Sequence, residues 1–471
     1  MTLFKSSFQI FIINALAALA QFLGIAYFAQ QLGATVMGIF FLFEAMRAII
    51  ATPADFGLIG ALEKRISENT TPGSFLTSAI VLKSAPLSVV IVTILLIEQH
   101  LNRYIGSDVA VFLVLALLFQ QASQTTLATL RGERRVSETV ALELVGKICW
   151  IAAGVVLVNL GFEVYALIFG TIFRHVLVFV LAAIRMSYYP KRFTRTHLRS
   201  LFDFGKYNVI SDIGGDFHNW LDVAIIGIFL TQAHVGAYET AWRVTAIGVF
   251  LSRAIAAVIF PEISRLDAEE DLLEVESLIE KGIKGSVLLV IPSFFGTLLF
   301  SKDILRFLFG TEFETAWLVL IILMGEKGIQ AVYTILNKSL KALNHPNLTA
   351  RATIVSVATN ILLNLILVSQ LGIEGAAIAT TVSIIANLIL HNMYLSDIIE
   401  VKFPIRFIIS SISASLCMYA TIRILLFRYS VSSLTDLIIL ALIGGLLYFI
   451  FALLFPPLRS TLKDTLQSIR I

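Results

Sequence analysis

Residues 150–169 read WIAAGVVLVNLGFEVYALIF, and the rest of the chain repeats their pattern. Two apolar runs meet at Asn159-Leu160-Gly161, a turn without charge, and extend outward to about residues 138 and 184. Each run is long enough to cross the roughly 30 Å hydrocarbon core of a bilayer as a helix. Strands of a membrane barrel would be about ten residues long and strictly alternating. The stretch therefore predicts two transmembrane helices joined by a short turn.

The composition extends this prediction to the whole chain. Of its 471 residues, 58% are hydrophobic and 14% are charged, whereas soluble proteins carry about 25% charged residues. A soluble fold of this size would have too little polar surface, so soluble enzymes, nucleic-acid-binding domains and disordered proteins are excluded. The two cysteines make no disulfide framework, and no residue cluster has metal-ligand spacing. We therefore expect no metal, no cofactor and no nucleic-acid partner.

Segmentation by apolar runs predicts an all-α polytopic membrane protein with about 14 spans. Twelve spans remain possible if two weak runs are misread. The long hydrophilic stretch 261–283 has apolar residues at helical spacing, which predicts an amphipathic helix at the cytoplasmic surface. The expected spans are 8–30, 36–60, 76–98, 107–129, 138–159, 163–184, 203–230, 235–260, 284–301, 315–338, 350–369, 374–396, 405–426 and 436–456.

Lysine and arginine residues gather in alternate connections, which fixes the predicted orientation. The connections on the other side, such as 30–33 and 159–161, are nearly free of cations. Both termini are therefore expected in the cytoplasm, which requires an even number of spans. The basic connections lie near 64–65, 131–135, 185–199, 265–281, 338–351, 402–406 and 459–470.

An internal repeat divides the chain into related halves. Leu160-Gly161-Phe162-Glu163 opens the sixth span, and Leu371-Gly372-Ile373-Glu374 opens the twelfth. We expect a first lobe over 1–200, a second over 201–400, and two further spans with a cytoplasmic tail over 401–471. A substrate site between two such halves is the usual transporter arrangement. Pro86 and Pro292 occupy similar places in the two halves and are either hinges or static kinks.

Charges within the predicted spans are the candidate functional residues, because a charge at mid-bilayer usually faces the protein interior or water. Guanidinium groups bind phosphate oxygens in a bidentate way and stay charged in a poor solvent. Arg47 and Arg243 rank first, since they occupy corresponding spans of the two halves. The candidate substrate-binding cations are Arg47, Arg243, Arg253, Lys147 and Lys327. The candidate ion-coupling or cavity carboxylates are Glu44, Glu143, Asp212, Asp216 and Glu326.

Structural interpretations stay open beside these roles. Glu44–Arg47 and Glu143–Lys147 have helical spacing that lets each pair neutralise itself. Arg253, like Lys83 and Arg174, has a long side chain that can reach the membrane surface. Asn360 and Asn364 are more simply explained by hydrogen bonds between neighbouring helices. No Gly-rich phosphate loop and no catalytic group is present in the sequence, so we expect a transporter and not an enzyme.

Four stretches of the chain together resemble one known family. They are Asp55-Phe56-Gly57-Leu58 with Lys64-Arg65; Phe260–Arg265; Leu308–Phe313; and Asn337–Leu343 with Asn360–Asn364 and Gly372–Thr380. Their order and spacing resemble the polysaccharide-transporter family of lipid-linked oligosaccharide flippases, the O-antigen flippase type. That family belongs to the multidrug, oligosaccharidyl-lipid and polysaccharide exporter superfamily.

The resemblance implies two six-helix lobes in a V, as in multidrug exporters of that superfamily, opening alternately to the two membrane faces. It implies transfer of a polyprenyl-diphosphate-linked oligosaccharide to the outer leaflet for surface glycan assembly. A prokaryotic plasma membrane, H⁺ or Na⁺ coupling, and polymerase or glycosyltransferase partners are expected with it. The alternatives are an ion-coupled multidrug exporter and a lipid II-type flippase. A membrane glycosyltransferase or polymerase is disfavoured because the loops are short.

Overall fold

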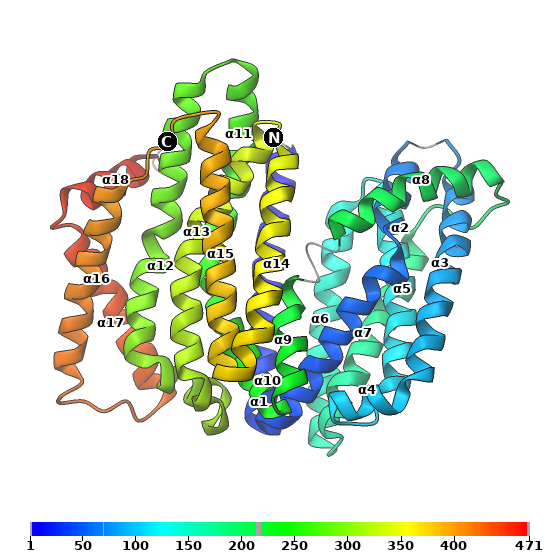
Figure 1. Cartoon of the computed structure of the whole chain (residues 1–471), viewed down its shortest axis with the longest axis horizontal. Helices are drawn as coiled ribbons and strands as arrows, with labels where there is room; N and C mark the ends of the chain where they lie inside the picture. Colours follow the sequence, from blue (N-terminus) through cyan, green and yellow to red (C-terminus); the bar gives the residue numbers. More distant parts are fainter. Residues whose placement is uncertain (1, 69, 213–217, 469–471) are drawn as a thin grey trace. The chain divides into compact units, whose positions relative to one another are not determined.

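The computed structural model describes residues 2–68, 70–212 and 218–468, and the side chains of 13–68, 70–206 and 220–463. Over these residues the chain forms helices and no strand (Figure 1), which confirms the predicted all-α fold class. Two compact units divide the chain, Met1–Gly236 and Ala237–Ile471. Each unit is described by itself below.

The first unit begins with a long helix that is broken in the middle. Helix α1 would be about 80 Å long if straight, more than twice the thickness of a bilayer core. Gly33 breaks it with φ 77° and ψ 172°, a conformation that only glycine adopts readily. The elements of this unit are α1 (Thr2–Asp55), α2 (Leu58–Ser67), α3 (Pro72–Leu96), α4 (Glu98–Ile105), α5 (Ala110–Gly132), α6 (Val136–Asn159), α7 (Glu163–Arg185), α8 (Arg195–Asp212), α9 (His218–Phe229) and the start of α10 (Gln232–Ala246).

Twelve segments of the described residues are long and apolar enough to cross a membrane. The segment Ile13–Asp55 contains two predicted spans, one on each side of Gly33. The predicted span over 203–230 lies partly outside the described residues: its described parts belong to α8 and α9, and residues 213–217 between them are not described.

Helix α8 belongs to the first unit because it packs on α2 and α3 (Figure 1). Leu201 is fully buried in a cluster with Leu58 and Leu62 of α2 and Leu76 of α3. The two compact units therefore divide between residues 236 and 237, whereas the sequence places the first lobe boundary at residue 200.

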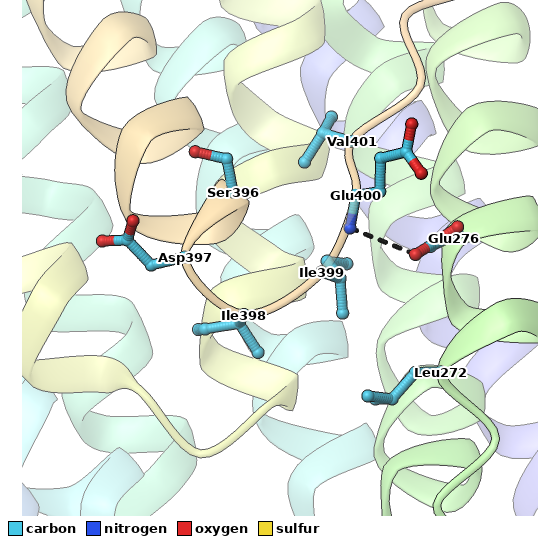
Figure 2. Close-up of a pocket in the computed structure, with 8 residues that line it drawn as sticks. All are labelled: Leu272, Glu276, Ser396, Asp397, Ile398, Ile399, Glu400 and Val401. Carbon is cyan, nitrogen blue, oxygen red and sulfur yellow. Dashed lines mark hydrogen bonds between the residues drawn. The ribbon is translucent and has the colours of Figure 1, made fainter.

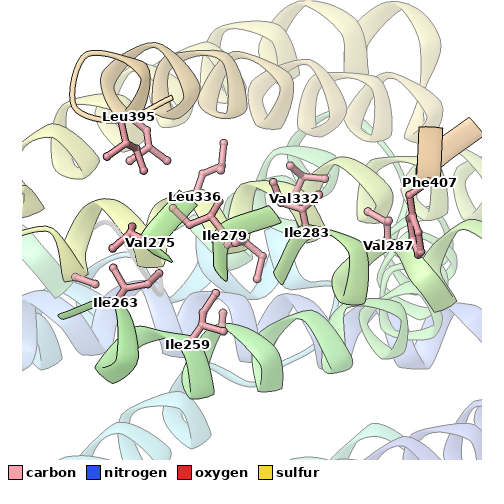
Figure 3. Packing of buried hydrophobic residues seen from close by; sticks show 14 of the residues in the cluster. Ile259, Ile263, Val275, Ile279, Ile283, Val287, Val332, Leu336, Leu395 and Phe407 are labelled. Atoms are coloured by element: carbon pink, nitrogen blue, oxygen red, sulfur yellow. The ribbon is translucent and has the colours of Figure 1, made fainter. Parts of the chain in front are cut away.

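The second unit is built around α12 and α13. Ile279 and Ile283 of α12 and Leu336 of α13 lie in one buried cluster, which Phe407 of α16 extends (Figure 3). The two predicted final spans are confirmed as helices α16 and α17, and both pack against α12. The elements of this unit are the rest of α10, η2 (Ile247–Val249), α11 (Phe250–Ala268), α12 (Leu272–Phe309), η3 (Thr311–Ala316), α13 (Trp317–Ala342), α14 (Pro346–Leu371), α15 (Ile373–Ser396), α16 (Ile405–Leu425), α17 (Leu434–Ala452) and α18 (Pro456–Ser468).

The predicted amphipathic helix over 261–283 is not a separate surface helix. The stretch contains the end of α11, a turn and the first turns of α12. Glu270 breaks the helix with φ 59°, and the Asp271 side chain then caps α12 by accepting a hydrogen bond from the Glu274 N–H at 3.1 Å. The apolar spacing arises because Ile263 and Val275 pack into the core of a helical hairpin (Figure 3).

Two helical hairpins carry the repeat seen in the sequence. Gly161 joins α6 to α7 with φ 84°, and Gly372 joins α14 to α15 with φ 67°. Both residues need the left-handed region that favours glycine. The same short Leu-Gly turn therefore closes one antiparallel hairpin in each unit.

Candidate functional site

An ion pair lies in the membrane-spanning part of α1. Arg47 Nη2 lies 2.5 Å from Glu44 Oε2, and Arg47 Nε donates to Glu44 Oε1 at 3.2 Å. The hydroxyl of Thr171 in α7 donates to the same carboxylate at 3.4 Å. The Arg47 and Glu44 side chains remain 12% and 14% exposed. The pair neutralises itself along one helix face, and both side chains keep a small exposed surface.

A second arginine adds charge to this group. Arg174 of α7 interacts electrostatically with Arg47, Glu44 and Glu143. Gly146 of α6 makes space for it, because a Cβ there would lie 3.1 Å from Arg174 Cγ. We call Glu44, Arg47, Glu143 and Arg174 the first cluster. It gathers two guanidinium groups and two carboxylates from three helices.

His175 and Lys147 border the first cluster. The Nδ1 of His175 lies 3.4 Å from the Ser123 hydroxyl of α5. The imidazole also interacts electrostatically with Arg47 and Arg174. Lys147 is half-buried, one helical turn beyond Glu143. The structure thus brings the predicted residues Glu44, Arg47 and Glu143 together.

A corresponding group lies in the second unit. Arg243 of α10 pairs with Glu239 one turn earlier, with Nη2 and Oε1 2.8 Å apart. On α13, Lys327 Nζ lies 2.7 Å from Glu326 Oε2 and 5.5 Å from the centre of the Trp242 ring. Glu326 is fully buried and Lys327 is 2% exposed. We call Glu239, Trp242, Arg243, Glu326 and Lys327 the second cluster.

The cations of both clusters share a depth within their helices. Each lies about 10 to 14 residues beyond the start of its helix, or beyond the break at Gly33. With a rise of about 1.5 Å per residue, this places them about 15–21 Å along the helix, near the middle of a 30 Å core. These starts all belong to the face predicted to be extracytoplasmic. The four cations are Arg47, Arg174, Arg243 and Lys327.

The other predicted residues lie elsewhere. Arg253 is on the exposed face of α11. Asp216 and the side chain of Asp212 lie outside the described residues. Helices α3 and α12 continue through Pro86 and Pro292.

Three members of the clusters are not among the predicted site residues. Arg174 was placed among the side chains that reach the membrane surface, but it joins the first cluster. Glu239 was not singled out, although its spacing from Arg243 was a readable signal, because residues four apart face each other on a helix. The sequence carries no pattern that indicates Trp242, because only tertiary packing places its ring beside Lys327.

A third buried ion pair lies where four helices of the first unit meet. Lys83 of α3 lies 2.6 Å from Asp55 at the end of α1, and it donates to the Thr125 hydroxyl of α5 at 3.0 Å. Asp55 also accepts from the Ile59 N–H of α2 at 3.2 Å. The pair therefore ties four helices together.

Polar contacts between α14 and α15 match the structural interpretation of Asn360. Its side-chain nitrogen donates to the Thr380 hydroxyl of α15 at 3.3 Å. The Asn364 side chain donates to the Asn360 carbonyl of its own helix at 3.0 Å. Across the described residues, no group of three or more His, Cys, Asp or Glu side chains is arranged to hold a metal ion.

Outside the spans, Arg135 joins the end of α7 to the α5–α6 turn. It donates to Glu138 at 2.7 Å and to the Arg185 carbonyl at 2.5 Å. Hydrogen bonds to Glu138, and then to Glu133, raise the pKa of Arg135. This arginine is fixed in a structural role.

A surface pocket of about 520 Å³ shares no lining residue with the charged clusters (Figure 2). It is formed by the start of α12 and the segment after α15. The Glu276 carboxylate accepts from the Glu400 N–H at 3.1 Å and helps to hold this segment. Its lining residues are Leu272, Glu276, Ser396, Asp397, Ile398, Ile399, Glu400 and Val401.

These helices and clusters define a polytopic helical membrane protein that carries paired cations inside its spans. Comparison with known families gives its place: the model for the polysaccharide biosynthesis protein family matches residues 36–318, and the chain belongs to this family. The family predicted from the sequence motifs is thereby confirmed.

Two curated relatives come from Haloferax volcanii. The probable low-salt glycan biosynthesis flippase Agl15 is 47% identical, and the match covers 98% of each chain. The probable flippase AglR is 29% identical, over 94% of this chain and 93% of the relative.

Solved structures share the fold at low sequence identity. Lipid II flippase MurJ in an inward closed conformation is 17% identical with a TM-score of 0.78, covering 95% of this chain and 98% of MurJ. An inward-facing multidrug resistance transporter is 16% identical with a TM-score of 0.61, over 81% and 94% of the two chains. These likenesses establish the fold alone.

Proposed function

We propose that this protein is a flippase that moves a lipid-linked oligosaccharide from the cytoplasmic to the outer leaflet by alternating access. The 47% identity to a relative named as a glycan biosynthesis flippase, over 98% of both chains, supports this proposal. The location would be a prokaryotic plasma membrane, with both termini in the cytoplasm. The protein would serve the assembly of surface glycans and would not itself be an enzyme.

The observation that carries the mechanism is the common depth of the cations in the two clusters. A phosphate group crossing a membrane loses its hydration and needs other partners at mid-depth. Arginine supplies them, because its guanidinium binds phosphate oxygens in a bidentate way. The polyprenyl tail would remain in lipid while the phosphate passes along these cations.

The carboxylates explain how such cations persist when no substrate is bound. An unpaired charge in a poor solvent costs several kcal/mol, and Glu44 and Glu239 provide the compensating charge within the same helix. We infer that substrate phosphate displaces Glu44 from Arg47, and Glu239 from Arg243. The ion pairs are then the resting state of the binding groups.

Ion coupling is a further part of the proposal. Glu326 is fully buried, and Lys327, with its Nζ 2.7 Å away, compensates its charge. Such a carboxylate is a suitable carrier for H⁺ or Na⁺ during transport. Asp212 and Asp216 remain candidates from the sequence. Polymerase or glycosyltransferase partners are proposed from the pathway that such a substrate implies.

The decisive experiment is deletion of the gene, followed by identification of the lipid-linked sugar on each membrane face. We expect a lipid-linked oligosaccharide to accumulate on the cytoplasmic side, and the wild-type gene to clear it. Arg47→Ala and Arg243→Ala should fail to clear it, although both insert into the membrane. Arg103→Ala, which removes an exposed cation of α4, is the matched control and should restore transport.

The same experiment separates the alternatives. If no lipid-linked sugar accumulates and drug-like cations are retained instead, the protein is an ion-coupled exporter and the proposal fails. If the accumulated lipid is a lipid II-type precursor, the direction and mechanism stand but the substrate changes. Full clearance by both arginine variants would remove the clusters from the mechanism.

A further inference from the structure

A basic and aromatic segment follows α7 in the first unit. We call residues 189–206 the basic strap; it contains the connection to α8 and the first three turns of that helix. Five cations accompany a single carboxylate, Asp203. Asp203 lies 3.1 Å from Lys206 and 3.6 Å from Arg199. The five cations are Lys191, Arg192, Arg195, Arg199 and Lys206.

Three of these cations have no ion-pair partner among the residues whose side chains are described. Lys191, Arg192 and Arg195 are exposed, and none of them forms an ion pair within the described residues. Arg199, with its side chain 86% exposed, has only the long contact to Asp203. The strap therefore presents a concentrated positive charge to its surroundings.

Exposed aromatic side chains lie among the cations. Tyr189, Phe193 and Phe202 are 58%, 38% and 45% exposed, which is unusual for a surface in contact only with water. On α8, Phe202 lies on the same face as Arg195 and Arg199, while Leu201 packs inward. Cations and aromatic rings on one helix face are typical of a helix at a membrane surface.

The strap is fixed to the end of a membrane span. Thr77 of α3 donates to the Lys191 carbonyl at 2.7 Å, and Ser74 of α3 donates to the Arg192 carbonyl at 2.7 Å. Ile80 and Val81, in the next turn of α3, are exposed apolar residues of a candidate span. One turn is about 5 Å, so the strap lies at the level of the lipid headgroups.

We propose that the basic strap is a binding site for anionic phospholipid headgroups on the face predicted to be cytoplasmic. Arginine and lysine bind the phosphates, and the aromatic rings occupy the interface between headgroups and acyl chains. Because hydrogen bonds to α3 already order the backbone, only side chains must become ordered on binding. The strap shares no residue with the first or the second cluster, and the proposal does not depend on the substrate that the protein moves.

Titration of the full-length protein in detergent with phosphatidylglycerol or phosphatidylcholine, with bound lipids counted by native mass spectrometry, tests the site. We expect Lys191→Gln/Arg192→Gln/Arg195→Gln to weaken phosphatidylglycerol binding at least about tenfold, since each cation near a surface contributes about 1 kcal/mol. Phosphatidylcholine binding and the elution profile should not change. The conservative variant Arg192→Lys/Arg195→Lys should retain binding, and added salt should weaken it in the wild type.

The matched control is Lys341→Gln/Arg351→Gln/Arg459→Gln, which removes three exposed cations of the second unit. It should bind phosphatidylglycerol as the wild type does. Equal loss in the control, or no loss in the strap variant, would overturn the proposal. Stronger competition by farnesyl diphosphate than by phosphatidylglycerol would also overturn it, because the strap would then hold an isoprenoid diphosphate. Loss of phosphatidylglycerol binding with intact transport would leave the proposed function untouched.

Discussion

At the scale of the residue, Glu44 stabilises Arg47 by pairing with it. The same carboxylate would compete with a substrate phosphate for the guanidinium group. Its fork to Glu44 neutralises a carboxylate inside the membrane-spanning part of α1. The same two guanidinium nitrogens are those that a phosphate would bind. The pair therefore joins a structural role to the transport role that we propose, and single substitutions alone cannot separate them.

A double substitution can separate these two roles. Arg47→Ala should destabilise the protein by roughly 3 kcal/mol, because Glu44 stays buried without its partner, and should abolish transport. Glu44→Gln/Arg47→Ala should recover most of the stability, as measured by thermal unfolding in detergent, but not the transport. Recovery of both properties would show that Arg47 has only a structural role.

For the Asp55–Lys83 pair we expect a structural role alone, so stability and transport should be lost together and recovered together. Lys83→Met leaves Asp55 buried without its charge partner, and we expect a loss of roughly 3 kcal/mol in unfolding free energy. Asp55→Asn/Lys83→Met removes both charges and keeps an acceptor for the Ile59 N–H. Stability and transport should then return together in this double variant. A stable double variant without transport would place this pair in the mechanism.

At the scale of the element, the break in α1 depends on one residue. Gly33 has φ 77°, which costs a residue with a Cβ about 1–3 kcal/mol. We expect Gly33→Ala to lower the unfolding temperature in detergent. The control is Gly296→Ala in α12, where a Cβ meets no atom within 4 Å. It should raise stability slightly, by about 0.5–1 kcal/mol. Equal effects of the two substitutions would contradict this account of the break.

Helix boundaries also show where sequence patterns fail. The start of the run 203–230 belongs to α8, which begins at Arg195 and packs on α2 and α3. The helical spacing in 261–283 was correctly recognised, but its apolar face is turned to the core of the second unit. A helical period of apolar residues indicates that one face of the helix is buried. It does not show whether that face packs against the protein core or against the membrane.

At the scale of the whole molecule, the ion coupling that we propose rests on the buried Glu326. If this carboxylate carries the coupling ion, Glu326→Gln should make transport independent of the ion gradient across a proteoliposome membrane. Gln keeps the shape of the side chain and removes its charge, so folding can be checked by elution profile. Unchanged dependence on both the H⁺ and the Na⁺ gradient would reject this role for Glu326.

The sequence by itself determined that this chain is an all-helical membrane protein, and it indicated the family and the Leu-Gly turns. Those properties depend on composition, on the length of apolar runs and on backbone conformation at single glycines, all of which are local. Only the tertiary structure decided that Arg174 joins Arg47, that Lys327 lies beside Trp242 and that Lys83 holds Asp55. Such pairings join helices distant in sequence, and they depend on how whole helix faces pack.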